Sequence, residues 1–214
     1  NCTMRNAETI KPRLRVVHVV FSFSTGGMEK GIAMLVQATH SEVEHIIVCI
    51  SQTGRSEELL PEGVRVLSLG KANGNSIGFI LKLSRVLKSL KPDVVHTRNW
   101  VGLDGAIAAR LAGINAVVHG EHGWGVVDPD GLNVKRVWIR RILSPLIREY
   151  TCVSKQMVDW LKNDIKVRQR VTQIYNGVDY DCYRPGNNPE SKKTFTICIV
   201  GRLDPIKDHL TLFR

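Results

Sequence analysis

Two cations near the end of the chain, Arg202 and Lys207, have the residue types and spacing needed to stabilise a leaving anion. They lie between an apolar run, which predicts a strand, and a segment that begins like a helix. A guanidinium and an ammonium held near a helix N-terminus can stabilise the charge that develops on a diphosphate leaving group without a metal. Taken alone, two charges on a loop are more often simply solvated, so the rest of the chain has to decide.

A pair of glycines, Gly26 and Gly27, follows Thr25 at the end of the loop after the apolar residues 16–20. Strand, glycine loop and helix form the first unit of an open α/β sheet, which binds its ligands at the carboxyl ends of its strands. Glycine can adopt positive φ and lets another molecule approach the backbone closely. We therefore expect this loop to lie at a ligand site, although a tight turn that only reverses the chain explains the two glycines equally well.

Polar residues follow two later apolar runs in the same way. His96 and Arg98 follow residues 93–95, and Glu121 and His122 lie in the loop 119–124 after another run. Arg98 suits a phosphate or a uronate, although a satisfied strand-end histidine and a surface arginine fit the first pair equally well. The two histidines of the second loop, His119 and His122, also raise the alternative of zinc, but a spacing of three in this context is weak evidence for a metal.

The elements that must position these side chains alternate along the chain. Apolar runs separated by amphipathic segments predict parallel strands joined by right-handed helical crossovers. The fold class is therefore α/β, with a Rossmann-like parallel sheet and helices on both faces. The expected strands are residues 16–20, 44–51, 64–67, 93–96, 116–119, 150–153 and 171–175, and the expected helices are 28–37, 76–90, 105–112 and 154–161.

Four regions follow from the order of these elements. The polar residues 1–13 lack the apolar core of a secretory signal and are expected to be a disordered tail. Residues 14–183 form one domain, and the Pro- and Gly-containing residues 184–193 form a linker. Residues 194–214 restart the pattern of strand, loop and helix, but one strand and a short helix cannot bury their own apolar surface. We expect them to be the start of a second Rossmann-like domain that has been cut away.

Composition narrows the function classes. The sequence contains no run of eighteen apolar residues, which a membrane-spanning helix would need. The five cysteines among the 214 residues are widely spaced, as is typical of reduced, cytoplasmic thiols. The net charge of +10 is compatible with nucleic acid, anionic lipid or phosphorylated substrates. The basic residues are spread over several segments with few interleaved aromatics, so nucleic-acid binding is the weakest of these options.

The segment 133–148 combines an apolar stripe that includes Trp138 with a basic flank that includes Arg136, Arg140 and Arg141. This is the composition of a helix lying on an anionic membrane surface. The alternative is that the stripe packs on the sheet and leaves its arginines in solvent. Pro145 interrupts the pattern and favours two shorter pieces.

Three stretches together resemble the GT-B glycosyltransferases, in particular the large retaining family 4 group, also described as the group 1 type. They are the loop STGGME at 24–29, the sequence IYNGVD at 174–179, and VGRLDPIKD at 200–208. The last stretch is similar to the family pattern G-R-L-x-x-x-K-G, except that Asp208 stands where glycine is usual. The resemblance extends from Arg15 to the end of the chain.

The resemblance implies an enzyme that moves a sugar, with retention, from a nucleotide-diphosphate sugar to a saccharide or lipid-linked acceptor in polysaccharide or glycolipid biosynthesis. It makes 14–183 the acceptor-side domain and 194–214 the start of the nucleotide-sugar-binding domain, in a metal-independent, cofactor-free protein at the inner face of the membrane. Without the paired glutamates of the second domain, the chain as given is expected to be inactive. The alternatives are a nucleotide-sugar epimerase and a non-catalytic Rossmann-like binding module.

The same resemblance assigns the site residues. His122 would contact the transferred sugar, with Glu121 in reserve because a count from Gly113 is uncertain by one residue. The implied catalytic residues are His122, Arg202 and Lys207, the donor-phosphate residues are Gly26, Gly27, Arg202 and Lys207, and the acceptor-side residues are Thr25, His96, Arg98 and Glu121.

Overall fold

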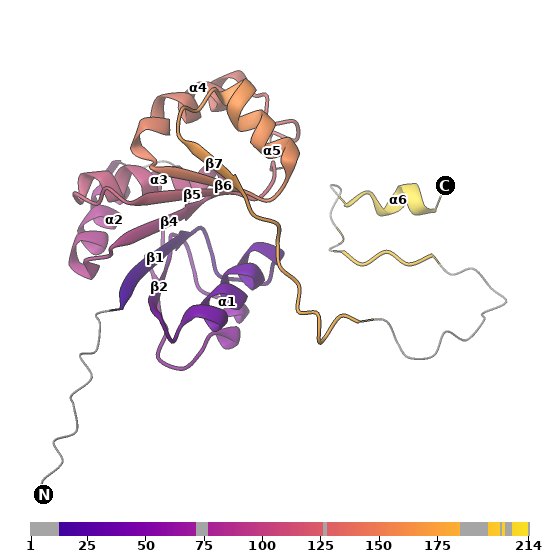
Figure 1. The fold of residues 1–214 in the computed structure, drawn as a ribbon, viewed down its shortest axis with the longest axis horizontal. Helices are drawn as coiled ribbons and strands as arrows, with labels where there is room; N and C mark the ends of the chain where they lie inside the picture. Colours follow the sequence, from indigo (N-terminus) through magenta and orange to yellow (C-terminus); the bar gives the residue numbers. More distant parts are fainter. Residues whose placement is uncertain are drawn as a thin grey trace, which may run out of the picture.

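The computed structural model describes residues 13–71, 77–125, 128–184, 197–201, 203 and 207–213, and its centre is one seven-stranded sheet (Figure 1). Every strand pair is parallel, and the strand order is β3-β2-β1-β4-β5-β6-β7, which confirms the predicted parallel α/β sheet. The strands are β1 (Leu14–Val20), β2 (Val43–Cys49), β3 (Arg65–Ser68), β4 (Val94–Arg98), β5 (Val117–Glu121), β6 (Glu149–Cys152) and β7 (Arg170–Gln173).

Helices cover both faces of this sheet, but unequally. On one face α1 packs through Ile32 and Val36 against residues such as Ile47 of β2. The larger core lies on the other face, beneath α2, α3, α4 and α5. The helical elements are α1 (Gly27–Thr39), η1 (Arg55–Leu59), α2 (Ile77–Leu90), α3 (Asn99–Leu111), α4 (Val134–Leu143), η2 (Ser144–Leu146), α5 (Lys155–Asp159), η3 (Trp160–Ile165) and α6 (His209–Leu212).

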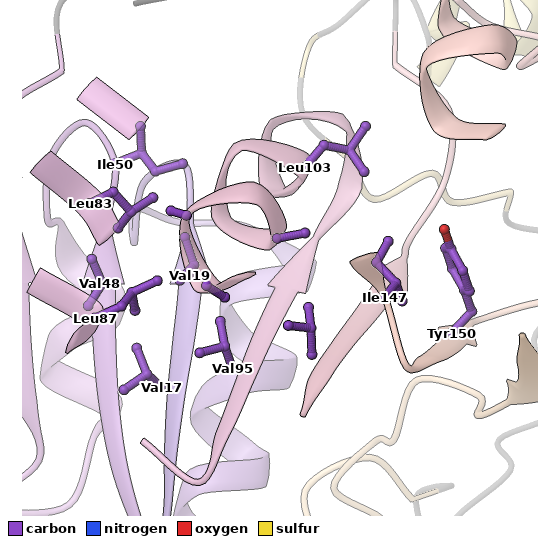
Figure 2. Packing of buried hydrophobic residues seen from close by; sticks show 14 of the residues in the cluster. Val17, Val19, Val48, Ile50, Leu83, Leu87, Val95, Leu103, Ile147 and Tyr150 are labelled. Carbon is purple, nitrogen blue, oxygen red and sulfur yellow. The ribbon is translucent and has the colours of Figure 1, made fainter. Parts of the chain in front are cut away.

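The core of the larger layer follows from the sequence pattern of α2. Its apolar residues recur every three or four positions, so that they share one face of the helix. Leu83 and Leu87 are fully buried, and Figure 2 shows them beside Val17, Val48 and Val95 of the sheet. Burying a leucine side chain in this way contributes about 1.5–3 kcal/mol relative to leaving it in water. The prediction of an amphipathic helix packed on the sheet is confirmed.

The junction between β4 and α3 differs from the expected one. The sequence predicted a polar loop over 97–100 and a helix from Gly105, but β4 extends to Arg98 and α3 begins directly at Asn99. Asn99 has a φ of 53°, in the left-handed region that asparagine tolerates better than most residues. This single residue turns the chain, and no separate loop is needed.

Strand β5 is also longer than expected. The sequence ended it at His119, whereas Gly120 and Glu121 still pair with Thr151 and Cys152 of β6. The loop expected over 119–124 therefore begins only at His122. This extension decides the position of Glu121, because successive side chains of a strand point to opposite faces of a sheet.

The segment after β6 confirms one prediction and corrects another. The Ser154 side chain accepts a hydrogen bond from the Met157 backbone N–H at 3.2 Å, as expected of the N-cap of α5. The helix was expected to end at Leu161, but it continues as the π-helical η3 to Ile165. The left-handed Lys166, with a φ of 63°, follows η3.

The region after the sheet carries little regular structure. The expected tail and linker lie outside the described residues over 1–12 and 185–193. Of the strand expected over 194–200, residues 197–200 are described, and they form no strand and are exposed. A strand needs a hydrogen-bonded neighbour, and none of the described residues provides one. Among the described residues after 200, the short helix α6 is the one named element. No described helix has both the length and the apolar character needed to cross a membrane.

Candidate functional site

Three strand ends meet at the carboxyl edge of the sheet and bring the predicted residues together. The loop after β1 leads into α1, β4 leads into α3, and β5 leads into the loop that begins at His122. Asn99 connects all three, because its Oδ1 accepts the His122 backbone N–H at 2.8 Å and its Nδ2 lies 3.6 Å from Met28 Sδ of α1. The sequence patterns did not identify Asn99 as the connecting residue. Its signal was an amide side chain directly after a strand.

The glycine pair is at this edge, but its conformation is not the expected one. Gly26 is the N-cap of α1 with a φ of −170°, which is extended backbone, and neither glycine has positive φ. A Cβ on Gly26 would collide with the Glu29 carboxylate, whereas a Cβ on Gly27 would meet nothing. Gly26 therefore gives room to a side chain of its own helix, and the helix N-terminus beside Gly27 is open.

This helix N-terminus borders a cavity of about 920 Å³, the glycine-loop cavity. Thr25, Gly26 and Gly27 line it, and so does Lys207, the one member of the predicted cation pair that the structure describes. Arg202, the other member, lies outside the described residues. The ammonium and the helix N-terminus thus border one space, which is a suitable environment for an anion.

A second cavity of about 350 Å³, the Arg98 cavity, lies between α1 and the ends of β4 and β6. Its walls are largely apolar, with Met34, Ile174 and Tyr175 among them, and the predicted residues His96, Arg98 and His122 line it as well. A mainly apolar pocket with a few polar groups is the usual form of a small-molecule site.

Arg98 is the charged group of this cavity. Its side chain is only 6% exposed, its Nε has no partner, and Nη2 makes a long contact of 3.4 Å with His96 Nδ1. Burial lowers the pKa of Arg98 to about 10, against the opposing charge of Glu29, so the guanidinium stays charged at neutral pH. A buried arginine without a hydrogen-bonded carboxylate is costly by itself and favours binding of an anion.

His122 separates the Arg98 cavity from a third cavity of about 220 Å³, which Trp100 and Arg136 also line. Its ring lies close over Gly120, where an added Cβ would come within 3.0 Å of Nε2. Burial, followed by the charge of Arg98, lowers the pKa of His122 to about 4. The imidazole is therefore neutral at pH 7 and can both donate and accept a hydrogen bond.

Comparison with known proteins decides the family. The sequence profile named Glycosyltransferase Family 4 matches residues 25–181, which include the glycine loop, Arg98, His122 and the whole sheet from α1 onward. The chain belongs to glycosyltransferase family 4. The resemblance noted in the sequence is therefore confirmed.

A curated relative supports the family 4 assignment. A galactosyltransferase of Escherichia coli, named UDP-Gal:alpha-D-GlcNAc-diphosphoundecaprenol alpha-1,3-galactosyltransferase, is 25% identical over 92% of this chain and 56% of its own length. The family 4 chain therefore spans little more than half of that relative.

Solved structures share the fold of this family 4 chain. HepE of Anabaena, in complex with UDP and glucose, superposes with a TM-score of 0.61 at 17% identity, over 82% of this chain and 47% of HepE. Sucrose-phosphate synthase of Thermosynechococcus elongatus superposes with a TM-score of 0.59 at 13% identity, over 81% of this chain and 51% of the synthase. A UDP-N-acetylglucosamine 2-epimerase of Rickettsia bellii superposes with a TM-score of 0.53 at 19% identity, over 76% of this chain and 44% of the epimerase. At these identities the likeness concerns the fold, which is the predicted GT-B type of Rossmann-like domain.

Glu121 of the family 4 chain does not line any of these three cavities. It is 1% exposed, and its Oε1 accepts a hydrogen bond from Arg140 Nε at 2.8 Å. Arg140 is therefore not part of a solvated basic flank, as the sequence suggested, but is buried against the sheet. His119 is also turned inward, with Nδ1 2.7 Å from the Thr97 hydroxyl.

Among the described residues no group of three or more His, Cys, Asp or Glu side chains could hold a metal ion.

A row of histidines lies beneath the Arg98 cavity of the family 4 chain. The rings of His45, His18 and His96 follow one another across β2, β1 and β4, with centroids 5.2 and 5.3 Å apart. Burial, followed by the charge of Arg98, holds the pKa values of His18 and His96 well below the usual range. These imidazoles are neutral in the folded protein.

The lowered pKa values of the buried histidines predict that the stability of the fold depends on pH. Because the folded pKa values of His18, His96 and His122 are lowered, the unfolded chain binds protons first, near its ordinary histidine pKa of about 6.5. The free energy of unfolding should be fully retained above that pH and should fall as the pH drops toward 4. Urea unfolding at a series of pH values measures it, and a flat profile between pH 6.5 and 5 would contradict the assignment. His122→Asn should make the slope shallower.

Proposed function

We propose that this family 4 chain is the acceptor-side part of a retaining glycosyltransferase that uses a nucleotide-diphosphate sugar. The observation that carries the proposal is the Arg98 cavity, where a buried guanidinium whose Nε has no hydrogen-bond partner lies beside a neutral imidazole at the carboxyl edge of the sheet. The family match and the position of the cavity beside the ends of β4 and β6 support it. The chain spans about half of its relatives, so the second half of the site is part of the proposal.

Each group has a distinct part in the proposed transfer. His122 contacts hydroxyl groups of the transferred sugar. Arg98 and His96 bind the acceptor in the Arg98 cavity, and Thr25 contributes from the glycine-loop cavity. Arg202 and Lys207 stabilise the leaving diphosphate beside the N-terminus of α1 at Gly27, without a metal or another cofactor. Retention is proposed from the family resemblance.

The acceptor is proposed to be lipid-linked. The Escherichia coli relative is named for an acceptor carried on diphosphoundecaprenol. The Arg98 cavity has a matching character, because one buried cation suits a diphosphate and its apolar walls suit the adjoining hydrocarbon. Such an acceptor implies polysaccharide or glycolipid biosynthesis at the cytoplasmic face of a membrane.

The test is a steady-state assay of the protein that carries both domains, with a panel of nucleotide sugars and a polyprenyl-diphosphate-linked saccharide. We expect transfer with retention in the presence of a chelator. Release of an epimerised nucleotide sugar without transfer would instead favour an epimerase. Absence of any nucleotide-sugar chemistry would favour a binding module.

His122→Ala provides a sharper outcome in the same assay. If the neutral imidazole contacts the sugar during transfer, its loss should lower kcat by tenfold or more, and not change KM alone. The matched control is His40→Ala, which changes an exposed histidine at the end of α1. An unchanged kcat in His122→Ala would remove His122 from the mechanism.

A further inference from the structure

Helix α4 exposes three apolar side chains and buries a charged one, whereas its other apolar residues, Val137, Ile139 and Leu143, pack against the core. Val134, Trp138 and Ile142 are 70%, 54% and 68% exposed, whereas Arg140 is 6% exposed. The three apolar residues are spaced by four positions and so lie along one side of the helix. Leu132, two residues before the first residue of the helix, is 56% exposed. These four residues form the α4 face.

Cations surround the α4 face. The helix sequence VKRVWIRRIL has four basic residues and no acidic one, and only Arg140 is neutralised by a buried partner. Lys135 is exposed, and the Arg141 guanidinium lies 5.0 Å from the centre of the Trp138 ring. Arg141 also donates to the backbone carbonyls of Asp164 and Ile165, which joins α4 to η3 and its exposed Lys162. The exposed acids near the two ends are Asp130 and Asp164.

We propose that the α4 face docks on an anionic lipid bilayer. A tryptophan and aliphatic side chains bordered by lysine and arginine match the boundary between acyl chains and anionic headgroups. A second copy of the chain is a poorer partner, because a symmetric contact would bring Lys135 and Arg141 against cations of the same kind.

The position of α4 links this surface to the candidate site. Arg136 and Arg140 of the same helix line the cavity that His122 borders. Docking α4 therefore places the carboxyl edge of the sheet near the bilayer, where a lipid-linked acceptor would be located. This last step rests on the proposed function, whereas the docking itself rests on the exposed residues alone.

Sedimentation of the chain with lipid vesicles tests the proposal without any transfer assay. Vesicles that contain about one-third phosphatidylglycerol should bind the chain and release it as salt is raised, whereas pure phosphatidylcholine vesicles should bind it weakly. Trp138 emission should shift to shorter wavelength on binding. Equal binding to both kinds of vesicle, or none to either, would overturn the proposal.

Matched variants locate the surface. The double variant Trp138→Ser, Ile142→Ser should weaken binding to anionic vesicles by tenfold or more, since two large apolar side chains no longer enter the bilayer. Leu111→Ser, which changes an equally exposed leucine on α3, should leave binding unchanged. Lys135→Glu should weaken binding and reduce its salt dependence, whereas Lys88→Glu on α2 should have little effect.

Two results would reject the α4 face specifically. The first is vesicle binding by the double variant equal to that of the unchanged chain. The second is a concentration-dependent dimer that the double variant abolishes, because the face would then belong to a second copy. Vesicle binding together with no sugar transfer by the protein that carries both domains would reject the proposed function and leave the docking proposal standing.

Discussion

Replacing Arg140 by leucine should lower the free energy of unfolding by about 3–5 kcal/mol, because it leaves the Glu121 carboxylate buried without its cation. The Arg140 Nε lies 2.8 Å from Glu121 Oε1, and both side chains are nearly inaccessible to water. The guanidinium also lies between the rings of Trp100 and Trp160, 5.0 Å from each centre, so the leucine loses these contacts as well. Urea unfolding at pH 7 measures the change.

Two controls separate the buried charge from the loss of packing. Arg136→Leu removes a guanidinium that lies 4.8 Å from the same Trp100 ring but has no carboxylate partner in the described part of the chain, and should cost about 0.5–1 kcal/mol. The double variant Glu121→Leu, Arg140→Leu should recover much of the lost stability, because two apolar groups replace the pair. A single Arg140→Leu variant as stable as Arg136→Leu would contradict the argument.

The same pair has a defined pH dependence. Burial alone would raise the pKa of Glu121, but the contact with His119 and the charge of Arg140 together outweigh it and hold the pKa below its usual value. The contribution of the pair is therefore present above the unfolded pKa of a glutamate and is lost as the pH falls through the lowered folded pKa. The difference between the unchanged chain and Arg140→Leu should shrink in acid.

Replacing Arg202 or Lys207 by alanine should lower turnover by about a hundredfold or more in the protein that carries both domains, the usual scale for losing one preorganised charge stabiliser. The reason is the negative charge that develops on the diphosphate as the bond to the sugar breaks. Lys207 already lines the glycine-loop cavity with Gly26 and Gly27, on the side where the N-terminus of α1 is open. Steady-state kinetics with the best nucleotide sugar measure the effect.

A chelator and a matched variant complete this experiment. If Arg202 and Lys207 stabilise the diphosphate as proposed, no metal is needed for this step, and a chelator should leave the rate unchanged. Lys30→Ala removes an ammonium that also lines the glycine-loop cavity but contacts the Tyr183 hydroxyl instead, and should have a small effect. Near-normal kcat/KM in Arg202→Ala and Lys207→Ala, or activity abolished by a chelator, would reject the assigned roles.

Most of the sheet could be predicted because the information is local. Runs such as the central residues of β2 are apolar on both sides, as a strand covered by helices requires, and the spacing of Leu83 and Leu87 indicates a helix on its own. The ends of elements depend on neighbours instead. Asn99 ends a strand by adopting positive φ, and β5 continues through Gly120 because β6 pairs with it, which no local pattern contains.

The site was predictable in position but not in detail for the same reason. Polar residues after strands indicated the carboxyl edge, and His96, Arg98 and His122 line one cavity there. The sequence could not show that Glu121 and Arg140 form a buried pair, because they are nineteen residues apart on different elements. Because Arg140 is buried, Trp138 and Ile142 of α4 face outward. The sequence left open which side of this helix faces the sheet.

The strand order has a consequence for the way this protein folds. β1 pairs with β2, and β4, β5, β6 and β7 pair in succession, so most strands meet a partner close to them in the chain. Among the strand pairs of this sheet, only β1 with β4, for example Val16 with Val94, joins these two blocks across a long intervening segment. Long-range contacts of this kind carry the largest loop-closure cost and form slowly. Gly27 and Arg98 lie on opposite sides of this junction, so the binding edge is completed only when the two blocks have joined.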